Sequence, residues 1–108
     1  MNYEMNIEDE YFKLIRDGIK QIEIRLNKPE RKAIKANDTI TLTNNKTKER
    51  MKALVVKKKE YKDFYELFND NSPASLGNLT DPSIMESFYT KADIEKYGAV
   101  AIYIVPLL

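Results

Sequence analysis

Hydrophobic and polar residues alternate strictly between residues 21 and 26, which is the pattern of a strand with one buried face. The even-numbered isoleucine and leucine side chains are predicted to face the core, whereas Glu23 and Arg25 face the other way. Lys20 comes directly before this strand. The pattern therefore predicts a compact cluster of charges on a rigid element, which is a suitable support for a functional site.

Apolar residues recur at helical spacing just before this strand and predict a helix over residues 7–17. Asn6 is the expected N-cap, and acidic residues occupy the first turn, where the helix dipole favours them. Gly18 supplies the left-handed residue that commonly ends a helix. A short alternating run predicts a first strand over residues 2–6.

Three later runs also have the character of strands. Residues 39–43 and 48–59 flank an Asn-Asn turn signal and predict a hairpin, and the apolar, β-branched run 99–105 is typical of a buried central strand. Because strands and helices do not alternate regularly, a doubly wound parallel sheet is not expected. We predict an α+β fold, with a small, mainly antiparallel β-barrel and flanking helices in one domain over residues 1–108.

The segment between the long strand and the last strand predicts short helices. Asp63 and Thr90 are the expected N-caps of the first and the last of them. Three apolar residues of the middle helix are expected in the core: Ile84, Met85 and Phe88.

The chain contains no cysteine and no histidine. This composition excludes disulfides, thiolate nucleophiles, zinc sites built on Cys or His, and Ser-His-Asp catalysis within one chain. Any catalytic group must then be Lys, Asp, Glu, Tyr, Ser or Thr. We expect no metal ion and no cofactor, because the acidic residues are not clustered in the sequence.

No apolar run approaches the length of about 20 residues that a membrane-spanning helix needs. The N-terminus lacks the basic and then apolar pattern of a signal peptide. We therefore expect a cytoplasmic protein.

The net charge of +1 conceals an asymmetry along the chain. Residues 13–62 hold sixteen Lys or Arg and six acids, whereas residues 63–108 hold two Lys or Arg and seven acids. One positive face that meets a polyanion explains this distribution, and so do lysines that protect strand edges from aggregation. Residues 57–59, all lysine, either extend that face or form a solvated strand end.

Lys20 and Glu23 are the candidate catalytic residues. A partly desolvated Lys20 beside Arg25 would have a lowered pKa and could act as a base near neutral pH. The alternative is a surface ion pair with Glu23, worth less than about 1 kcal/mol.

The candidate ligand-binding residues are cationic or aromatic. The planar fork of Arg25 suits both phosphate and base edges, and Arg31 and Lys32 could add phosphate contacts. Tyr61 and Tyr89 could stack on bases, although each also suits core packing with an exposed hydroxyl.

Three segments together resemble the signature of the ASCH domains: Tyr11-Phe12 with Gly18-x-Lys20-x-Ile22-Glu23-x-Arg25-Leu26-Asn27, then Ile34-x-x-x-Asp38-x-Ile40, then Tyr97-Gly98-Ala-Val-Ala-Ile102. The resemblance implies a PUA-like β-barrel. The family is generally thought to bind RNA or handle nucleotides in a cleft lined by the G-x-K-x-I-E-x-R motif, so the resemblance implies such a cleft here. Asn27, two residues after Arg25, is a further candidate ligand-binding residue.

The chain departs from the family pattern at two places. Asn37-Asp38 replaces the usual Gly-Asp, and Asn tolerates the left-handed geometry of that turn. Some small ASCH proteins resemble amidohydrolases of acetylated cytidine, with a Thr nucleophile where this chain has Glu23. A carboxylate cannot form the same ester intermediate.

Three hypotheses follow. The first is a module that binds RNA or a nucleotide-sized ligand in a cleft containing Lys20, Glu23 and Arg25. The second is an enzyme that uses the same cleft, either a nucleoside amidohydrolase or a metal-independent ribonuclease. The third is a protein-interaction module without a nucleic-acid role.

Overall fold

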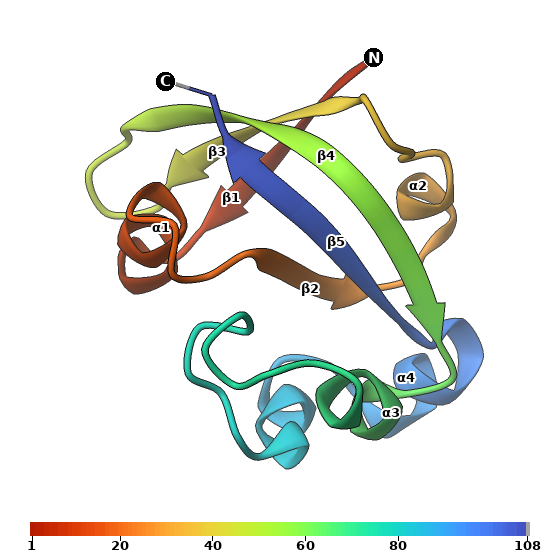
Figure 1. The fold of residues 1–108 in the computed structure, drawn as a ribbon. Coiled ribbons are helices and arrows are strands. Elements are labelled where there is room, and N and C mark those ends of the chain that lie inside the picture. Colours follow the sequence, from red (N-terminus) through yellow and green to blue (C-terminus); the bar gives the residue numbers. More distant parts are fainter. Residues whose placement is uncertain (108) are drawn as a thin grey trace.

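Five strands form one curled sheet in the computed structural model, which describes residues 1–107 (Figure 1). The strands are β1 (Asn2–Ile7), β2 (Ile22–Leu26), β3 (Thr39–Asn44), β4 (Arg50–Tyr61) and β5 (Ala99–Pro106). Their order across the sheet is β1-β3-β4-β5-β2. The β1–β3 pair is parallel and the other neighbouring pairs are antiparallel. The predicted mainly antiparallel α+β fold is therefore confirmed, as a half-barrel with flanking helices.

The helices lie on both sides of this half-barrel: α1 (Asp9–Arg16), α2 (Pro29–Lys32), α3 (Phe64–Asn69), the 3₁₀ helix η1 (Pro82–Ser87) and α4 (Lys91–Tyr97). Helix α1 packs against β3 and β5. Helices α3, η1 and α4 form a group next to β2, below the sheet in Figure 1.

The two sides of the sheet bury separate hydrophobic clusters. The first contains Phe12 and Ile15 of α1 together with residues of β1, β3, β4 and β5. The second joins the even-numbered residues of β2 to the α3–α4 group. Residues of β5 alternate between the two clusters, so this strand is buried on both faces, as predicted. Glu23 and Arg25 lie on the opposite face of β2 from the second cluster, also as predicted.

The predicted N-cap of the first helix is wrong. Asn6 remains in β1, where it pairs with Thr43 in the parallel ladder, so α1 begins at Asp9 after Glu8. The caps of later helices are confirmed: the Asp63 side chain accepts from the Glu66 amide, and Thr90 accepts from the Asp93 amide. Local signals gave the right cap where no strand competed for the same residue.

The predicted burial of the middle helix is also wrong in part. Met85 is buried, but Ile84 is 40% exposed and Phe88 is 60% exposed. The segment is a 3₁₀ helix with about three residues per turn, so Ile84 does not share a face with Met85. Phe88 follows the helix and stands at the edge of a pocket.

Asn37 has φ 75°, so it adopts the left-handed geometry expected at this turn. The buried carboxylate of Asp38 accepts from the Lys35 amide and from the N-terminal ammonium. These contacts lower the pKa of Asp38, with the Lys35 amide as the largest cause.

Gly98 provides a test of backbone constraint. It has φ 72° and ψ −166°, and a Cβ there would lie 2.6 Å from the Tyr61 carbonyl oxygen. Gly18 also has a positive φ, 79°, but a Cβ there meets no atom within 4 Å. We predict that Gly98→Ala lowers the free energy of unfolding by about 2–4 kcal/mol and Gly18→Ala by about 1 kcal/mol, measured by urea denaturation. Equal losses would contradict this account.

Candidate functional site

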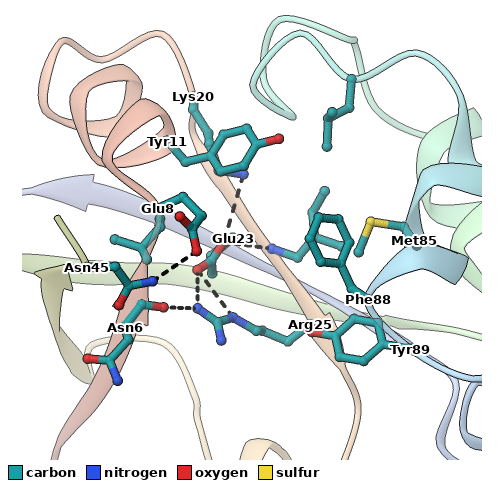
Figure 2. A pocket seen from close by; sticks show the side chains of 13 residues that line it. Asn6, Glu8, Tyr11, Lys20, Glu23, Arg25, Asn45, Met85, Phe88 and Tyr89 are labelled. Carbon is teal, nitrogen blue, oxygen red and sulfur yellow. Dashed lines mark hydrogen bonds and ion pairs between the residues drawn. The ribbon is translucent and has the colours of Figure 1, made fainter.

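A pocket of about 180 Å³ lies where the edge strands β1 and β2 face each other without a backbone ladder between them (Figure 2). It receives side chains from the end of β1, from α1, from β2, from the β3–β4 turn and from the segment around η1. The lining residues are Asn6, Ile7, Glu8, Tyr11, Lys20, Glu23, Ile24, Arg25, Asn45, Leu79, Met85, Phe88 and Tyr89.

The carboxylate of Glu23 is at the centre of the polar floor. Its Oε2 accepts from Arg25 Nη2 at 2.7 Å and from Arg25 Nε at 3.3 Å. Its Oε1 accepts from the Ile24 amide at 3.2 Å and lies 3.9 Å from Lys20 Nζ. Glu23 is only 5% exposed. Two cations and a backbone amide therefore compensate the charge of a buried carboxylate.

Arg25 connects the two edge strands. While one side of its guanidinium holds Glu23, Nη2 also donates to the Asn6 carbonyl of β1 at 2.8 Å. Burial opposes its charge, but attraction to Glu23 and the hydrogen bonds outweigh burial, so the pKa of Arg25 lies above its usual value. One side chain thus bridges the opening of the half-barrel and stays charged.

Lys20 is covered by the loop before η1. Its ammonium donates to the Ile22 carbonyl, and the side chain is nearly inaccessible. A Cβ at Gly77 would lie 3.1 Å from Lys20 Cδ, which is a tight contact, and Gly77 has φ 83°, so glycine suits the close packing of this loop. Burial lowers the pKa of Lys20, Glu23 opposes this effect, and Arg25 adds to it.

Aromatic rings form the walls above this floor. Tyr11 stands over Lys20, with the Nζ atom 5.6 Å from the ring centroid. Tyr89 is stacked on Phe64, with centroids 5.9 Å apart and planes 4° from parallel. Phe88 also lines the pocket (Figure 2), and its side chain is 60% exposed.

A second carboxylate stands at the rim. The exposed Glu8 accepts from Asn45 Nδ2 at 3.0 Å. The pocket lining therefore combines two cations, Lys20 and Arg25, with two carboxylates, Glu8 and Glu23. Its formal charge is balanced, which favours a neutral guest over an anion.

Of the eight residues predicted from the sequence, four line this pocket: Lys20, Glu23, Arg25 and Tyr89. The other four do not: Asn27, Arg31, Lys32 and Tyr61. Asn27 is buried beyond the end of β2, and its Oδ1 has no hydrogen-bond partner within residues 1–107.

Arg31 and Lys32 belong to α2, and their carbonyls accept from Lys58 Nζ. Tyr61 donates to Asp70, which also pairs with Lys59 at 2.6 Å. The desolvated, hydrogen-bonded hydroxyl of Tyr61 has a raised pKa, and the pKa of Asp70 is lowered by Lys59 and Tyr61.

The lysine run 57–59 makes contacts within the chain. Lys57 lies over the Tyr103 ring, with Nζ 4.5 Å from the centroid, while Lys58 and Lys59 have the partners described above. These contacts give the three lysines a structural role. That they also form part of a positive surface stays a prediction.

Sequence reasoning missed Tyr11 and Phe88 as pocket residues. Tyr11 belongs to the apolar stripe of the first helix, and Phe88 fits the apolar pattern of a middle helix, so both were predicted as packing residues. For Tyr11 a signal was present, because a tyrosine on an apolar stripe keeps a hydroxyl that must reach solvent or a partner.

A model of the ASCH domain family matches residues 5–107. The chain belongs to the ASCH domain family. The resemblance seen in the sequence is therefore confirmed, and the PUA-like fold that it implied is present as a half-barrel.

Solved structures agree with this assignment of the ASCH domain. The hypothetical protein PH0355 is 31% identical, with a TM-score of 0.88, and the match covers 99% of this chain and 100% of that one. Protein PF0455 from Pyrococcus furiosus is 30% identical, with a TM-score of 0.71 and coverage of 99% and 98%. An ASCH domain from Lactobacillus crispatus JV V101 is 16% identical, with a TM-score of 0.60 and coverage of 97% and 79%, which shows the shared fold. A search of curated proteins finds no significant match.

Within residues 1–107, no group of three or more Asp or Glu residues lies close enough together to hold a metal ion. No helix in the same part of the chain has both the length and the apolar character needed to cross a bilayer.

The Arg25–Glu23 pair can be compared with a surface pair of the same length. Arg50 Nη2 lies 2.7 Å from Glu4 Oε1, as Arg25 Nη2 does from Glu23 Oε2, but the side chains of the surface pair are 61% and 68% exposed. We predict that Arg25→Met lowers the free energy of unfolding by about 3 kcal/mol, because it leaves Glu23 buried with a weaker partner. Arg50→Met should cost less than about 1 kcal/mol. If urea denaturation gives similar losses of unfolding free energy for the two variants, the buried pair does not stabilise the contact between β1 and β2.

Proposed function

We propose that this ASCH domain binds RNA or a nucleotide by admitting one nucleobase into the pocket between β1 and β2. The observation that carries the proposal is the combination of a charged floor, built from Lys20, Glu23 and Arg25, with aromatic walls. Membership of the ASCH family supports it, since the family is generally thought to bind RNA.

The size of the pocket supports a ring-sized guest. At about 180 Å³ it is smaller than the roughly 300–1,000 Å³ of pockets that enclose drug-sized ligands. A single base fits this volume, whereas the ribose and phosphate must remain outside. The same pocket can therefore serve a free nucleotide or one nucleotide of a single strand, which would present its unstacked base.

The charge of the pocket supports a base rather than a phosphate as the buried group. Phosphate sites in proteins gather uncompensated cations and amide groups. Here both cations of the lining are close to Glu23, and Glu8 adds a further negative charge at the mouth. A neutral heterocycle can hydrogen-bond to such a floor without repulsion.

The aromatic walls supply the non-polar part of binding. Stacking of a base on an aromatic side chain is worth about 1–3 kcal/mol, whatever the base. Phe88 is the best placed for this role, because it is exposed at the mouth and covers little of the core.

We predict that Phe88→Ala weakens binding of nucleoside monophosphates and of a short single-stranded RNA by about 5- to 100-fold, measured by calorimetry. The melting temperature should hardly change, since the side chain is 60% exposed. Tyr65→Ala is the matched control, an aromatic residue that is 54% exposed and does not line this pocket. Equal effects of the two variants, or no binding by the wild type, would refute the proposal. If the wild type binds the single-stranded RNA but none of the nucleoside monophosphates, the RNA strand is the ligand.

A second candidate function has one specific observation in its favour. Lys20, with its lowered pKa, lies 3.9 Å from Glu23 in the pocket floor. A neutral Lys20 could take a proton from a water that attacks an acyl group on the amine of a bound nucleoside. The proton would then pass to the amine as the acyl–nitrogen bond breaks.

If this hydrolysis occurs, acylated cytidine should be turned over at a rate that rises with pH up to the pKa of Lys20, below its ordinary value. Lys20→Met, which keeps the bulk of the side chain, should abolish turnover and weaken nucleoside binding much less. If the wild type binds acylated cytidine but does not hydrolyse it, the enzymatic function is excluded and only the binding function stands.

A further inference from the structure

We infer that Glu23 positions Arg25 and does not itself contact the ligand, and that Arg25 recognises the bound base through an acceptor atom of its ring edge, such as a carbonyl oxygen. The inference rests on the proposed function and specifies which group of the base the pocket reads. It assigns to the motif an orienting carboxylate and a ligand-binding cation.

The Glu23 carboxylate already accepts three hydrogen bonds within the chain. An ionised carboxylate offers about four lone-pair positions. Arg25 Nε and Nη2 donate to Oε2, the Ile24 amide donates to Oε1, and the Lys20 ammonium lies 3.9 Å from Oε1 as an ion pair. Glu23 is 5% exposed and surrounded by these donors, so an amino group of a base would have to push one of them aside in a buried floor, which is costly.

Arg25, in contrast, has donor capacity left. Its Nη1 makes no hydrogen bond to any of residues 1–107, and it is not among the buried polar atoms without a partner. In Figure 2 the dashed lines reach only two of the three guanidinium nitrogens. Glu23 and the Asn6 carbonyl fix the plane of the group, so the direction of the free N–H groups is set before a ligand arrives.

The floor is thus a donor surface. The Lys20 ammonium donates to the Ile22 carbonyl and forms an ion pair with Glu23, and Arg25 Nη1 has no hydrogen-bond partner within residues 1–107. A carbonyl oxygen on a ring edge can accept from the free Nη1, as guanine O6 accepts from Arg. An amino group in the same place would oppose one donor with another. Glu8, the remaining carboxylate of the lining, lies at the rim and holds Asn45.

Three purine monophosphates separate these contacts. GMP and IMP share O6 and N7, and differ only in the amino group at C2, whereas AMP carries an amino group in place of O6. We expect wild-type protein to bind GMP and IMP with affinities within about twofold of each other, and AMP at least about tenfold more weakly. All three should be measured by calorimetry in one buffer.

The outcomes separate the inferred roles of Glu23 and Arg25 from the proposed binding of RNA or a nucleotide. Binding of GMP much more tightly than IMP, or of AMP as tightly as IMP, would overturn the inference but leave nucleotide binding intact. Failure of all three nucleotides and of single-stranded RNA to bind would overturn the proposed function and the inference with it.

Two variants test the separate roles. Arg25→Lys keeps the charge but lacks Nη1, and it should bring the IMP-to-AMP ratio close to one. Glu23→Gln should weaken IMP and GMP equally, because it loosens Arg25 without removing a base contact. A selective loss of GMP relative to IMP in Glu23→Gln would show that Glu23 contacts the amino group. Should either variant fail to fold, the wild-type nucleotide series decides the question.

Discussion

The hydrogen bonds from Arg25 to Glu23 and to the Asn6 carbonyl are the interaction on which the rest of the site depends. The sheet is a half-barrel, so its two edge strands lack the backbone ladder that would close it. A guanidinium from β2 bridges that opening, and the carboxylate that holds it comes from the same strand. The opening becomes a pocket with a rigid polar floor rather than an exposed strand edge.

Burial of this ion cluster has an energetic cost that the fold must offset. Glu23 and Lys20 are almost fully buried, and desolvation of each charge is unfavourable. The chain limits the cost with close partners and with dense cover from the loop at Gly77 and from the hydrophobic cluster on the other side of β2. The result is a site whose geometry is fixed before binding, which lowers the entropy that a ligand must lose.

Local patterns predicted much of this architecture, because the relevant interactions are short in sequence. The alternation around Glu23 placed the charges on one face of a strand, and the apolar run of β5 identified a strand buried on both faces. Long-range contacts account for the failures. Asn6 is held in β1 by Thr43, and Phe88 lies at the pocket because of how η1 packs. The lysines at 58 and 59 contact α2 and Asp70, which local sequence could not indicate.

The central claim is that the opening between β1 and β2 is the ligand site. An NMR titration of the wild-type protein with a nucleoside monophosphate tests it most directly, with both backbone amides and the arginine Nε–H groups observed. The account predicts saturable shifts at the Arg25 Nε–H and at the amides of Gly77 and Phe88. It predicts no shifts at Tyr61 or Lys32, which lie outside the pocket. Shifts confined to α2 and the end of β4, with Arg25 unchanged, would contradict it.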